Sequence, residues 1–327
     1  MAKVNWSGAM ISESRQRLIE LLADGEFHSG EALAESLSVS RAAIHNNIEA
    51  LAELGLEIFR VRGKGYRLER PLSLLDGAQV NEGREAPLHL FWQLASTNDF
   101  INQRRERCRN GEACLAEMQT SGRGRRGRVW QSPLASHLYL SYFYRLEQGM
   151  TAAAGLSLAV GVMLVDALTE QGFRDVSLKW PNDLYLEGRK LGGVLVELSG
   201  QFGEPAELTI GMGINVAMPA AIATQIDQPW SDLQQQADGC IDRSQLANGL
   251  LHHLDRGMAL FAEQGLTPFV TRWQQLDCFA GKPVKLLMGE REINGIAAGI
   301  DADGNLLLDE AGQQRRFAAG EISLRGR

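Results

Sequence analysis

Apolar residues near the start of the chain recur every three or four positions, the spacing of helices that bury one face. The spacing predicts three short helices, indicated by Leu18, Ile19, Leu21 and Leu22, by Ala32, Leu33 and Leu37, and by Ile44, Ile48 and Leu51. The third helix runs from Arg41 to about Leu54. Ser40 can cap its free amide groups, and Gly55 ends it.

Two short strands follow, around 56–61 and 66–68, with a turn at Gly63-Lys64-Gly65. Helices followed by such a wing predict a winged helix-turn-helix over residues 1–70. The wing is basic and contains Arg60, Arg62, Lys64, Arg67 and Arg70. The candidates for DNA contact are Ser40, Arg41, His45 and Asn46 on the third helix, with Asn47 beside them, and Arg62 and Lys64 on the wing. The alternatives are a solvated hairpin and a module that docks proteins.

The rest of the chain changes pattern twice. Residues 71–87 are rich in turn residues and predict a linker. Long apolar strands and helices over 88–276 predict an α/β domain, with strands near 138–144, 194–198 and 208–214 and helices near 151–171 and 244–263. Short alternating segments with glycine-rich turns over 277–327 predict a small β-barrel. The expected fold class is therefore a multidomain α/β (α+β) protein.

Composition narrows the classes of function. A length of 327 residues exceeds one ordinary domain, and a net charge of −7 argues against a uniformly basic nucleic-acid coat while allowing a local basic site. The four cysteines form no CxxC pair or zinc spacing, which is typical of free thiols in a reducing cytoplasm. The apolar run over 152–168 is short and interrupted, so we expect a buried helix rather than a membrane span.

Four short segments in the α/β region combine glycine with cationic or amide side chains. They are Ser96-Thr97-Asn98, Gln119 to Trp130 with GRGRRGRVW at 122–130 (the arginine loop), Lys179-Trp180-Pro181-Asn182-Asp183, and Arg189 to Gly193. Gly211 to Asn215 is a weaker fifth. Taken singly, these segments are also explained by a helix cap, an ion pair or tight packing. Neither GxGxxG nor a P-loop is present, so a Rossmann or Walker nucleotide site is not supported.

Taken together, the pattern GRGRRGR-x-W-x-SP, then KWPND, then RKL-x-G resembles the catalytic domain of biotin protein ligases. The preceding winged helix and the GEISLR segment at 320–325 are similar to the bifunctional bacterial form, which also represses the biotin operon. The resemblance covers essentially the whole chain. It implies a central domain of the class II synthetase-like biotin/lipoate ligase fold with a mixed sheet, followed by an SH3-like barrel.

The resemblance also implies the chemistry. Biotin and ATP, with Mg²⁺ carried by ATP rather than by protein side chains, would give biotinyl-5′-AMP and pyrophosphate. Biotin would then pass to one lysine of the biotin carboxyl carrier protein of acetyl-CoA carboxylase. The adenylate would act as corepressor, a homodimer would form when it is bound, and that dimer would bind operator DNA. No membrane partner is expected.

Roles carry over to individual residues by the same resemblance. Those implied to bind biotin are Ser96, Thr97, Asn98, Gln119, Arg123, Gly124, Arg125, Lys190, Gly193, Gly211 and Gly213. Those implied to act in catalysis are Lys179, Lys190 and Arg125, with Asp183 either orienting a lysine or touching the metal. Met218 and Trp230 are candidates to cover the adenylate, although Trp230 also fits an ordinary surface loop. The third helix lacks an exposed lysine, which leaves the operator sequence open.

Two other functions compete with this hypothesis. A transcription factor that only senses a small ligand would not need Lys179, Lys190 and the arginine loop, because sensing biotin requires no neutralisation of phosphate. A lipoate ligase would share the catalytic fold, but the GRGRRG loop and the fused winged helix favour biotin.

Overall fold

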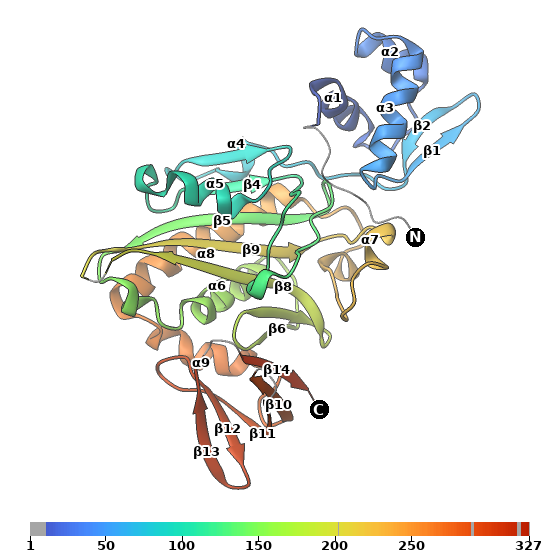
Figure 1. Cartoon of the computed structure of the whole chain (residues 1–327). Coiled ribbons are helices and arrows are strands. Elements are labelled where there is room, and N and C mark those ends of the chain that lie inside the picture. Colours follow the sequence, from blue (N-terminus) through green and yellow to red (C-terminus); the bar gives the residue numbers. More distant parts are fainter. Residues whose placement is uncertain (1–10, 202, 289–290, 319–321, 327) are drawn as a thin grey trace.

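The structure, a computed structural model, describes residues 11–201, 203–288, 291–318 and 322–326, which form three units in chain order (Figure 1). The first is a winged helix-turn-helix that projects from one end of the central domain, with α1 (Glu13–Leu22), α2 (Gly30–Ser36), α3 (Arg41–Glu53), β1 (Ile58–Val61) and β2 (Gly65–Leu68). The hydroxyl of Ser40 accepts a hydrogen bond from the amide of Ala43 at 3.2 Å and so caps α3 as predicted. Residues 1–10 lie outside the described part of the chain.

The central domain is built on a seven-stranded mixed sheet in the order β3-β4-β5-β9-β8-β7-β6, in which only the β3–β4 pair is parallel. Its strands are β3 (Leu88–Phe91), β4 (Ala113–Ala116), β5 (His137–Leu146), β6 (Val176–Lys179), β7 (Asp183–Leu186), β8 (Arg189–Ser199) and β9 (Ala206–Asn215). Its principal helices are α5 (Thr97–Arg104), α6 (Leu156–Glu170), α8 (Arg243–Gln264) and α9 (Thr267–Leu276). Shorter helical pieces are η1 (Arg105–Arg107), η2 (Arg125–Gly127), η3 (Met150–Ala153), α7 (Ala220–Ala223) and η4 (Leu233–Gln236).

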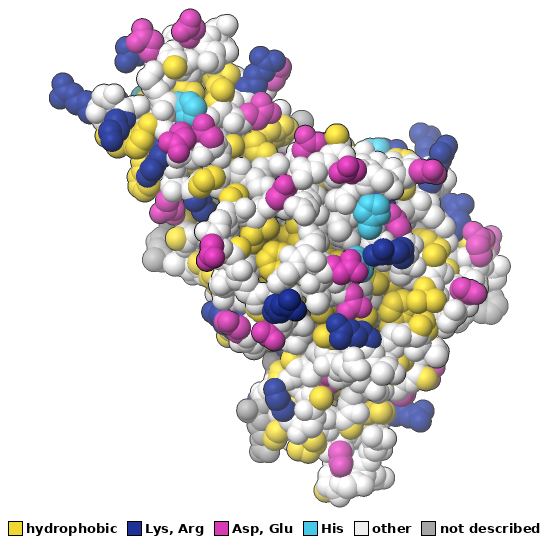
Figure 2. Space-filling view, turned by 180° about the vertical axis from the view of Figure 1, so that it is seen from behind, with side chains coloured by type: hydrophobic (Ala, Val, Ile, Leu, Met, Phe, Trp, Pro, Cys, Tyr) yellow, Lys and Arg dark blue, Asp and Glu magenta, His cyan; other side chains and the backbone are white. Residues whose placement is uncertain are grey.

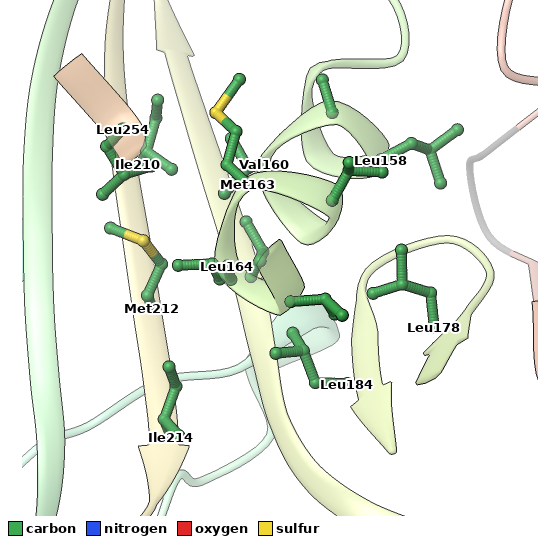
Figure 3. Close-up of a cluster of buried hydrophobic side chains, with 14 of the residues drawn as sticks. Leu158, Val160, Met163, Leu164, Leu178, Leu184, Ile210, Met212, Ile214 and Leu254 are labelled. Carbon is green, nitrogen blue, oxygen red and sulfur yellow. The ribbon is translucent and has the colours of Figure 1, made fainter. Parts of the chain in front are cut away.

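The sheet separates the main core from the functional face. On β9, Ile210, Met212 and Ile214 point toward α6, where Leu164 packs against them (Figure 3). Alternate residues of a strand point to opposite faces, so the intervening Gly211 and Gly213 face the other side. The apolar run expected as a buried helix is α6, and no helix among the described residues is long and apolar enough to span a membrane.

The segment expected as a linker, 71–87, packs against the central domain. It contains the short helix α4 (Gly77–Val80), and Val80 is fully buried in the main core. The buried guanidinium of Arg243 pairs with Glu117 and donates a hydrogen bond to the carbonyl of Ser73 at 2.7 Å. The buried ion pair with Glu117 fixes Arg243 in place. The hydrogen bond from Arg243 to Ser73 therefore holds residues 71–87 against the central domain.

The last unit is an antiparallel sheet in the order β13-β12-β11-β10-β14, in agreement with the short alternating segments. Its strands are β10 (Pro283–Met288), β11 (Arg291–Ile300), β12 (Leu306–Glu310), β13 (Gln313–Phe317) and β14 (Ile322–Gly326). Trp180 Nε1 donates a hydrogen bond to the carbonyl of Gly304 at 3.1 Å, so this unit contacts the KWPND segment directly. Of the GEISLR segment, residues 320 and 321 lie outside the described residues.

Candidate functional site

One pocket gathers every residue expected to bind biotin or to act in catalysis. It lies on the sheet face that carries α5 and the arginine loop, opposite α6. The expected residues that line it are Ser96, Thr97, Asn98, Gln119, Arg123, Gly124, Arg125, Lys179, Asp183, Lys190, Gly193, Gly211 and Gly213. Residues more than 100 positions apart therefore form one site, which none of the segments could show alone.

A chain of buried hydrogen bonds forms one wall of the pocket. The Oε1 atom of Gln119 accepts hydrogen bonds from the amide and the hydroxyl of Thr97, at 2.8 and 3.1 Å. The Nε2 atom of Gln119 donates to Ser132 Oγ at 3.1 Å, and Ser141 Oγ lies 2.7 Å from Thr97 Oγ1. Because all four side chains are buried, their satisfied polar groups form a rigid wall.

The second wall of the pocket is formed by the side chain of Asn98, which packs against β9. A Cβ atom at Gly211 would lie 2.3 Å from Asn98 Oδ1, so only glycine permits this approach. Gly213 has the same role for Trp130, whose indole would lie 2.5 Å from an added Cβ. The strand glycines thus make room for side chains from α5 and the arginine loop. Tight packing does explain these glycines, and the side chains that pack against them are residues of the site.

The arginine loop folds over the pocket as a short turn. Gly124 and Arg128 pair through a backbone hydrogen bond of 2.8 Å, and η2 lies between them. Arg126 adopts a left-handed conformation with φ 60° and is exposed. Arg125 Nη1 donates to Asn182 Oδ1 at 3.0 Å, and burial lowers the pKa of the Arg125 guanidinium.

Arg123 at the start of this loop makes a bidentate pair with Asp99, at 2.6 and 2.9 Å. Hydrogen bonding to Asp99 raises the pKa of Arg123, so its charge is fixed. At the other end of the loop, Trp130 Nε1 is buried without a hydrogen-bond partner among the described residues. A buried donor without a partner is costly, which makes this nitrogen an unusual feature of the pocket wall.

Two lysines bring positive charge to the opposite side. Lys190 Nζ lies 2.7 Å from Asp183 Oδ1 and 5.6 Å from the centre of the Trp130 ring. Lys179 Nζ donates to the hydroxyl of Tyr185 at 2.9 Å. Among the lining residues that the structure describes, these groups and Arg125 outnumber the carboxylate of Asp183, which suits an anionic ligand. No group of three or more His, Cys, Asp or Glu side chains could hold a metal ion in the part of the chain that the structure describes.

The residues expected to cover the adenylate are not brought to this pocket. Met218 lines a separate cavity between the winged unit and the central domain, together with Leu56 and Arg70. Trp230 is half-buried and pairs with Lys190 through a backbone bridge, while Gln228 from the same segment lines the main pocket. Gln228 is therefore the residue through which this segment lines the pocket in the structure.

The sequence motifs left several contributors unassigned. Trp130 and Asn182 lie inside quoted motifs and line the pocket, so the motifs themselves carried the signal. Asp99 and Glu197 lie outside them and contact Arg123. No local sequence pattern identifies Asp99 or Glu197 as a site residue, because their partner Arg123 is distant from both in the sequence.

The winged unit presents most of its expected DNA-binding residues to solvent. Arg41 and Asn46 on α3 and Arg62 and Lys64 at the wing are exposed, and Figure 2 shows basic side chains at the outer edge of this unit. His45 is half-buried, with Nδ1 3.9 Å from a carboxylate oxygen of Glu49.

Three polar residues of this unit have other structural contacts. The hydroxyl of Ser40 accepts the capping hydrogen bond of α3. Asn47 contacts α1, because its side chain bonds Ser14 at 3.3 Å and Arg15 at 3.4 Å. Arg70, counted with the wing, turns away from it and donates to the carbonyl of Ala217 at 3.0 Å.

The chain matches three family models in succession. They are an HTH domain over residues 14–67, the Biotin/lipoate A/B protein ligase family over 90–215, and the Biotin protein ligase C terminal domain over 279–325. Among relatives, the chain is 48% identical to the "Bifunctional ligase/repressor BirA" of Salmonella typhimurium over 94% of this chain and 96% of that protein. It is 29% identical to the Bacillus subtilis protein of the same description, over 96% of this chain and all of that one. Among solved structures, the biotin protein ligase from Aquifex aeolicus in complex with biotin and ATP is similar with a TM-score of 0.65 and 30% identity, over 74% of this chain and 99% of that chain.

Proposed function

The chain belongs to the family of bifunctional biotin protein ligases and repressors, and from that premise we infer that the pocket beside the arginine loop carries out both steps of biotin ligation. The protein is an ATP-dependent ligase that forms biotinyl-5′-AMP and transfers biotin to a lysine of the biotin carboxyl carrier protein. It is also a DNA-binding repressor of the biotin operon. The observation that carries the proposal for the site is the convergence on one cationic pocket of all the residues expected to bind biotin or to act in catalysis.

In the first step, the biotin carboxylate attacks the α-phosphorus of ATP. A carboxylate oxygen–phosphorus bond forms, the bond to the β-phosphate oxygen breaks, and pyrophosphate leaves. Both reactants are anionic, so the step needs positive charge that is already in place. Lys190, Lys179 and Arg125 supply it from this chain, and Mg²⁺ bound to the phosphates of ATP adds to it. Asp183 holds the ammonium of Lys190 in position at 2.7 Å.

The walls of the pocket would bind biotin itself. The Ser96–Asn98 segment and Gln119 offer donors and acceptors for the ureido group, and Gly211 and Gly213 let ligand and side chains approach the strand. Trp130 Nε1 offers one more donor. A site of this kind fixes orientation through a few polar groups in an otherwise packed pocket.

In the second step, the carrier lysine attacks the carbonyl of the mixed anhydride. An amide bond forms, the bond to the phosphate oxygen breaks, AMP leaves, and the lysine loses a proton. No nucleophilic side chain of this protein is required, because the anhydride is itself activated. The arginine loop would close over the adenylate and keep it from water and from other lysines.

For repression, we propose that the adenylate is the corepressor and that it favours a homodimer. Each winged unit would place α3 in the major groove and its wing on phosphates, and two half-sites would supply affinity that one modest interface lacks. The carrier protein and operator DNA as partners support a cytoplasmic location for this activity. Sedimentation with and without biotin and ATP tests the switch. A liganded protein that stays monomeric while it occupies its operator would exclude coupled dimerisation.

The ligase function is tested by incubating the protein with biotin and ATP and measuring pyrophosphate, then adding carrier protein and detecting biotinylated lysine. We expect pyrophosphate with biotin and little with lipoate. Release with lipoate but not with biotin would identify a lipoate ligase, and release with neither would leave only a ligand sensor.

A further inference from the structure

Glu197 is a carboxylate on β8 that lies outside all of the sequence motifs. Polar groups from two segments, α5 and the arginine loop, contact it. Its Oε2 atom accepts hydrogen bonds from Asn98 Nδ2 at 2.8 Å and from Asn102 Nδ2 at 2.9 Å. Its Oε1 atom lies 3.4 Å from Arg123 Nη2 of the arginine loop. The side chain is one-third exposed, so these contacts lie at the rim of the pocket. The two oxygens thus contact different parts of the site.

The contact through Oε2 determines which way the Asn98 amide points. A carboxylate only accepts hydrogen bonds, so Asn98 must turn its NH₂ group toward Glu197. Its oxygen then faces Ser141 Oγ and the open position at Gly211. Asn98 lines the pocket and is only 6% exposed, so a flipped amide would present the wrong group to a ligand there.

Asn102 makes the arrangement rigid. It donates to the same oxygen of Glu197 and accepts a hydrogen bond from Thr209 Oγ1 at 2.6 Å. A polar path therefore runs from β9 through Asn102 and Glu197 to Asn98. Connected hydrogen-bond networks of this kind hold their members in one geometry.

The contact through Oε1 belongs to the arginine loop. Arg123 is held mainly by its bidentate pair with Asp99, and Glu197 gives a second negative charge on the same side. The side chain of Asp99 pairs with Arg123 alone among the described residues named here, whereas the side chain of Glu197 contacts both Arg123 and Asn98. This difference separates the two roles experimentally.

We propose that Glu197 is a positioning residue that orients the Asn98 amide for biotin through one oxygen and, with Asp99, holds the arginine loop closed through the other. The inference rests on the proposed function, because it takes biotin as the ligand beside Asn98. Glu197 does not touch the reacting atoms, so its effect must be on binding of biotin and on the loop rather than on the chemical step.

Three variants of the full-length protein test it. Glu197→Ala removes both contacts. Glu197→Gln keeps an oxygen for the two asparagines but turns an uncharged NH₂ toward Arg123. Asp99→Asn weakens only the Arg123 pair. The measurements are KM for biotin and kcat in pyrophosphate release, biotin affinity by calorimetry without ATP, and the rate at which trypsin cleaves the arginine loop.

We expect Glu197→Ala to weaken biotin affinity and raise KM for biotin about tenfold or more, while kcat at saturating biotin changes little. Glu197→Gln and Asp99→Asn should keep KM near the parental value but speed tryptic cleavage of the loop several-fold. We therefore expect KM for biotin and the rate of tryptic cleavage to change independently among the variants. A merely structural role would change both quantities together in all three variants.

The proposal is overturned if Glu197→Ala binds biotin as the parent does, or if Glu197→Gln loses biotin affinity to the same extent as Glu197→Ala. The parent distinguishes this failure from failure of the proposed function. If the unaltered protein neither binds biotin nor releases pyrophosphate, the proposed function itself is wrong and the role of Glu197 falls with it.

Discussion

At the scale of single residues, Lys190 has the most sharply defined position in the pocket. Its ammonium lies 2.7 Å from Asp183, and both side chains are less than one-fifth exposed. The preceding residue, Arg189, is less buried, with 41% of its side chain exposed, and it pairs with Glu187 instead. Neighbouring cations on one strand therefore have different surroundings, and of the two only Lys190 lines the pocket.

We predict that Lys190→Ala lowers the rate of adenylate formation by roughly 100- to 1000-fold, because it removes one preorganised positive group from the transition state. Pyrophosphate release under saturating biotin and ATP measures the effect, and circular dichroism checks the fold. Arg189→Ala is the matched control and should keep the parental rate. A folded Lys190→Ala protein with normal release would remove Lys190 from the mechanism.

Asp277, where α9 meets the last unit, supports a prediction on pH. Its Oδ2 atom is buried and has no hydrogen-bond partner among the described residues, and burial raises the pKa of Asp277 from 3.8 to about 6. Folding therefore favours the neutral acid. This stabilisation is complete below about pH 4 and is lost as the pH rises through about 6.

Asp277→Asn should accordingly stabilise the protein at pH 7.5 by about 1–3 kcal/mol and have almost no effect near pH 4. Urea unfolding at both pH values measures the difference in the free energy of unfolding. Asp303→Asn, at an exposed turn, is the control. Equal effects of Asp277→Asn at the two pH values would show that its carboxyl does not titrate between them.

At the scale of elements, the arginine loop combines mobility with specific anchors. Gly127 has φ 68° and an added Cβ would meet nothing within 4 Å, so this part of the loop is open to solvent. Arg125 instead reaches down to Asn182 at 3.0 Å. A loop held by a few side chains can open for substrates and close on them.

Arg125→Gly should leave adenylate synthesis partly intact but loosen retention of the intermediate. The expected signs are faster dissociation of labelled adenylate and biotin on lysines of bystander proteins. Arg126→Gly, which alters an exposed neighbour, should label only the carrier. If Arg125→Gly holds the adenylate as long as the parent, closure does not depend on this residue; if it loses only DNA binding, the loop is a DNA tether.

The wing is an element whose charge can be tested separately. Arg62 and Lys64 are exposed at its tip, whereas Arg70 is directed to Ala217. Neutralising Arg62 and Lys64 together should weaken binding to all DNA sequences and reduce the slope of log affinity against log salt by about 2. Arg70→Gln is the control and should leave the slope unchanged. An unaltered slope in the double variant would exclude the wing from phosphate contact.

Elements were largely predictable from the sequence because their signals are local. Helical spacing and Ser40 identified α3, and the long apolar runs identified α6 and β9. The pocket residues inside motifs were also found in advance. Asp99 and Glu197 were not, because each is defined by a partner that only the fold brings near. Cover of the adenylate by Met218 stays a prediction, and Met218 lines the cavity beside the winged unit.

At the scale of the whole molecule, the winged unit is not merely tethered to the ligase domain. Met118 and Leu134 of the central domain are buried in the same apolar cluster as α1 and α3. The amide of Ile11 donates a hydrogen bond to Gln93 Oε1 at 3.2 Å. Arg70 donates a hydrogen bond to the carbonyl of Ala217, which precedes the segment that carries the pocket residue Gln228. The DNA-binding unit and the ligand pocket are therefore connected through packed contacts, which allows each to affect the other.

Removing residues 1–70 separates the two activities and tests that connection. Operator binding should be lost, because α3 and the wing are gone, while biotin and ATP should still release pyrophosphate, because every pocket residue remains. Affinity for biotin should fall, since exposed Met118 and Leu134 and the lost contact at Ala217 loosen the neighbouring segment. Full-length Arg70→Ala is the control that removes only the Ala217 contact. A truncated protein that still binds its operator specifically would place DNA recognition elsewhere, and one that keeps parental biotin affinity would show that the two units act independently.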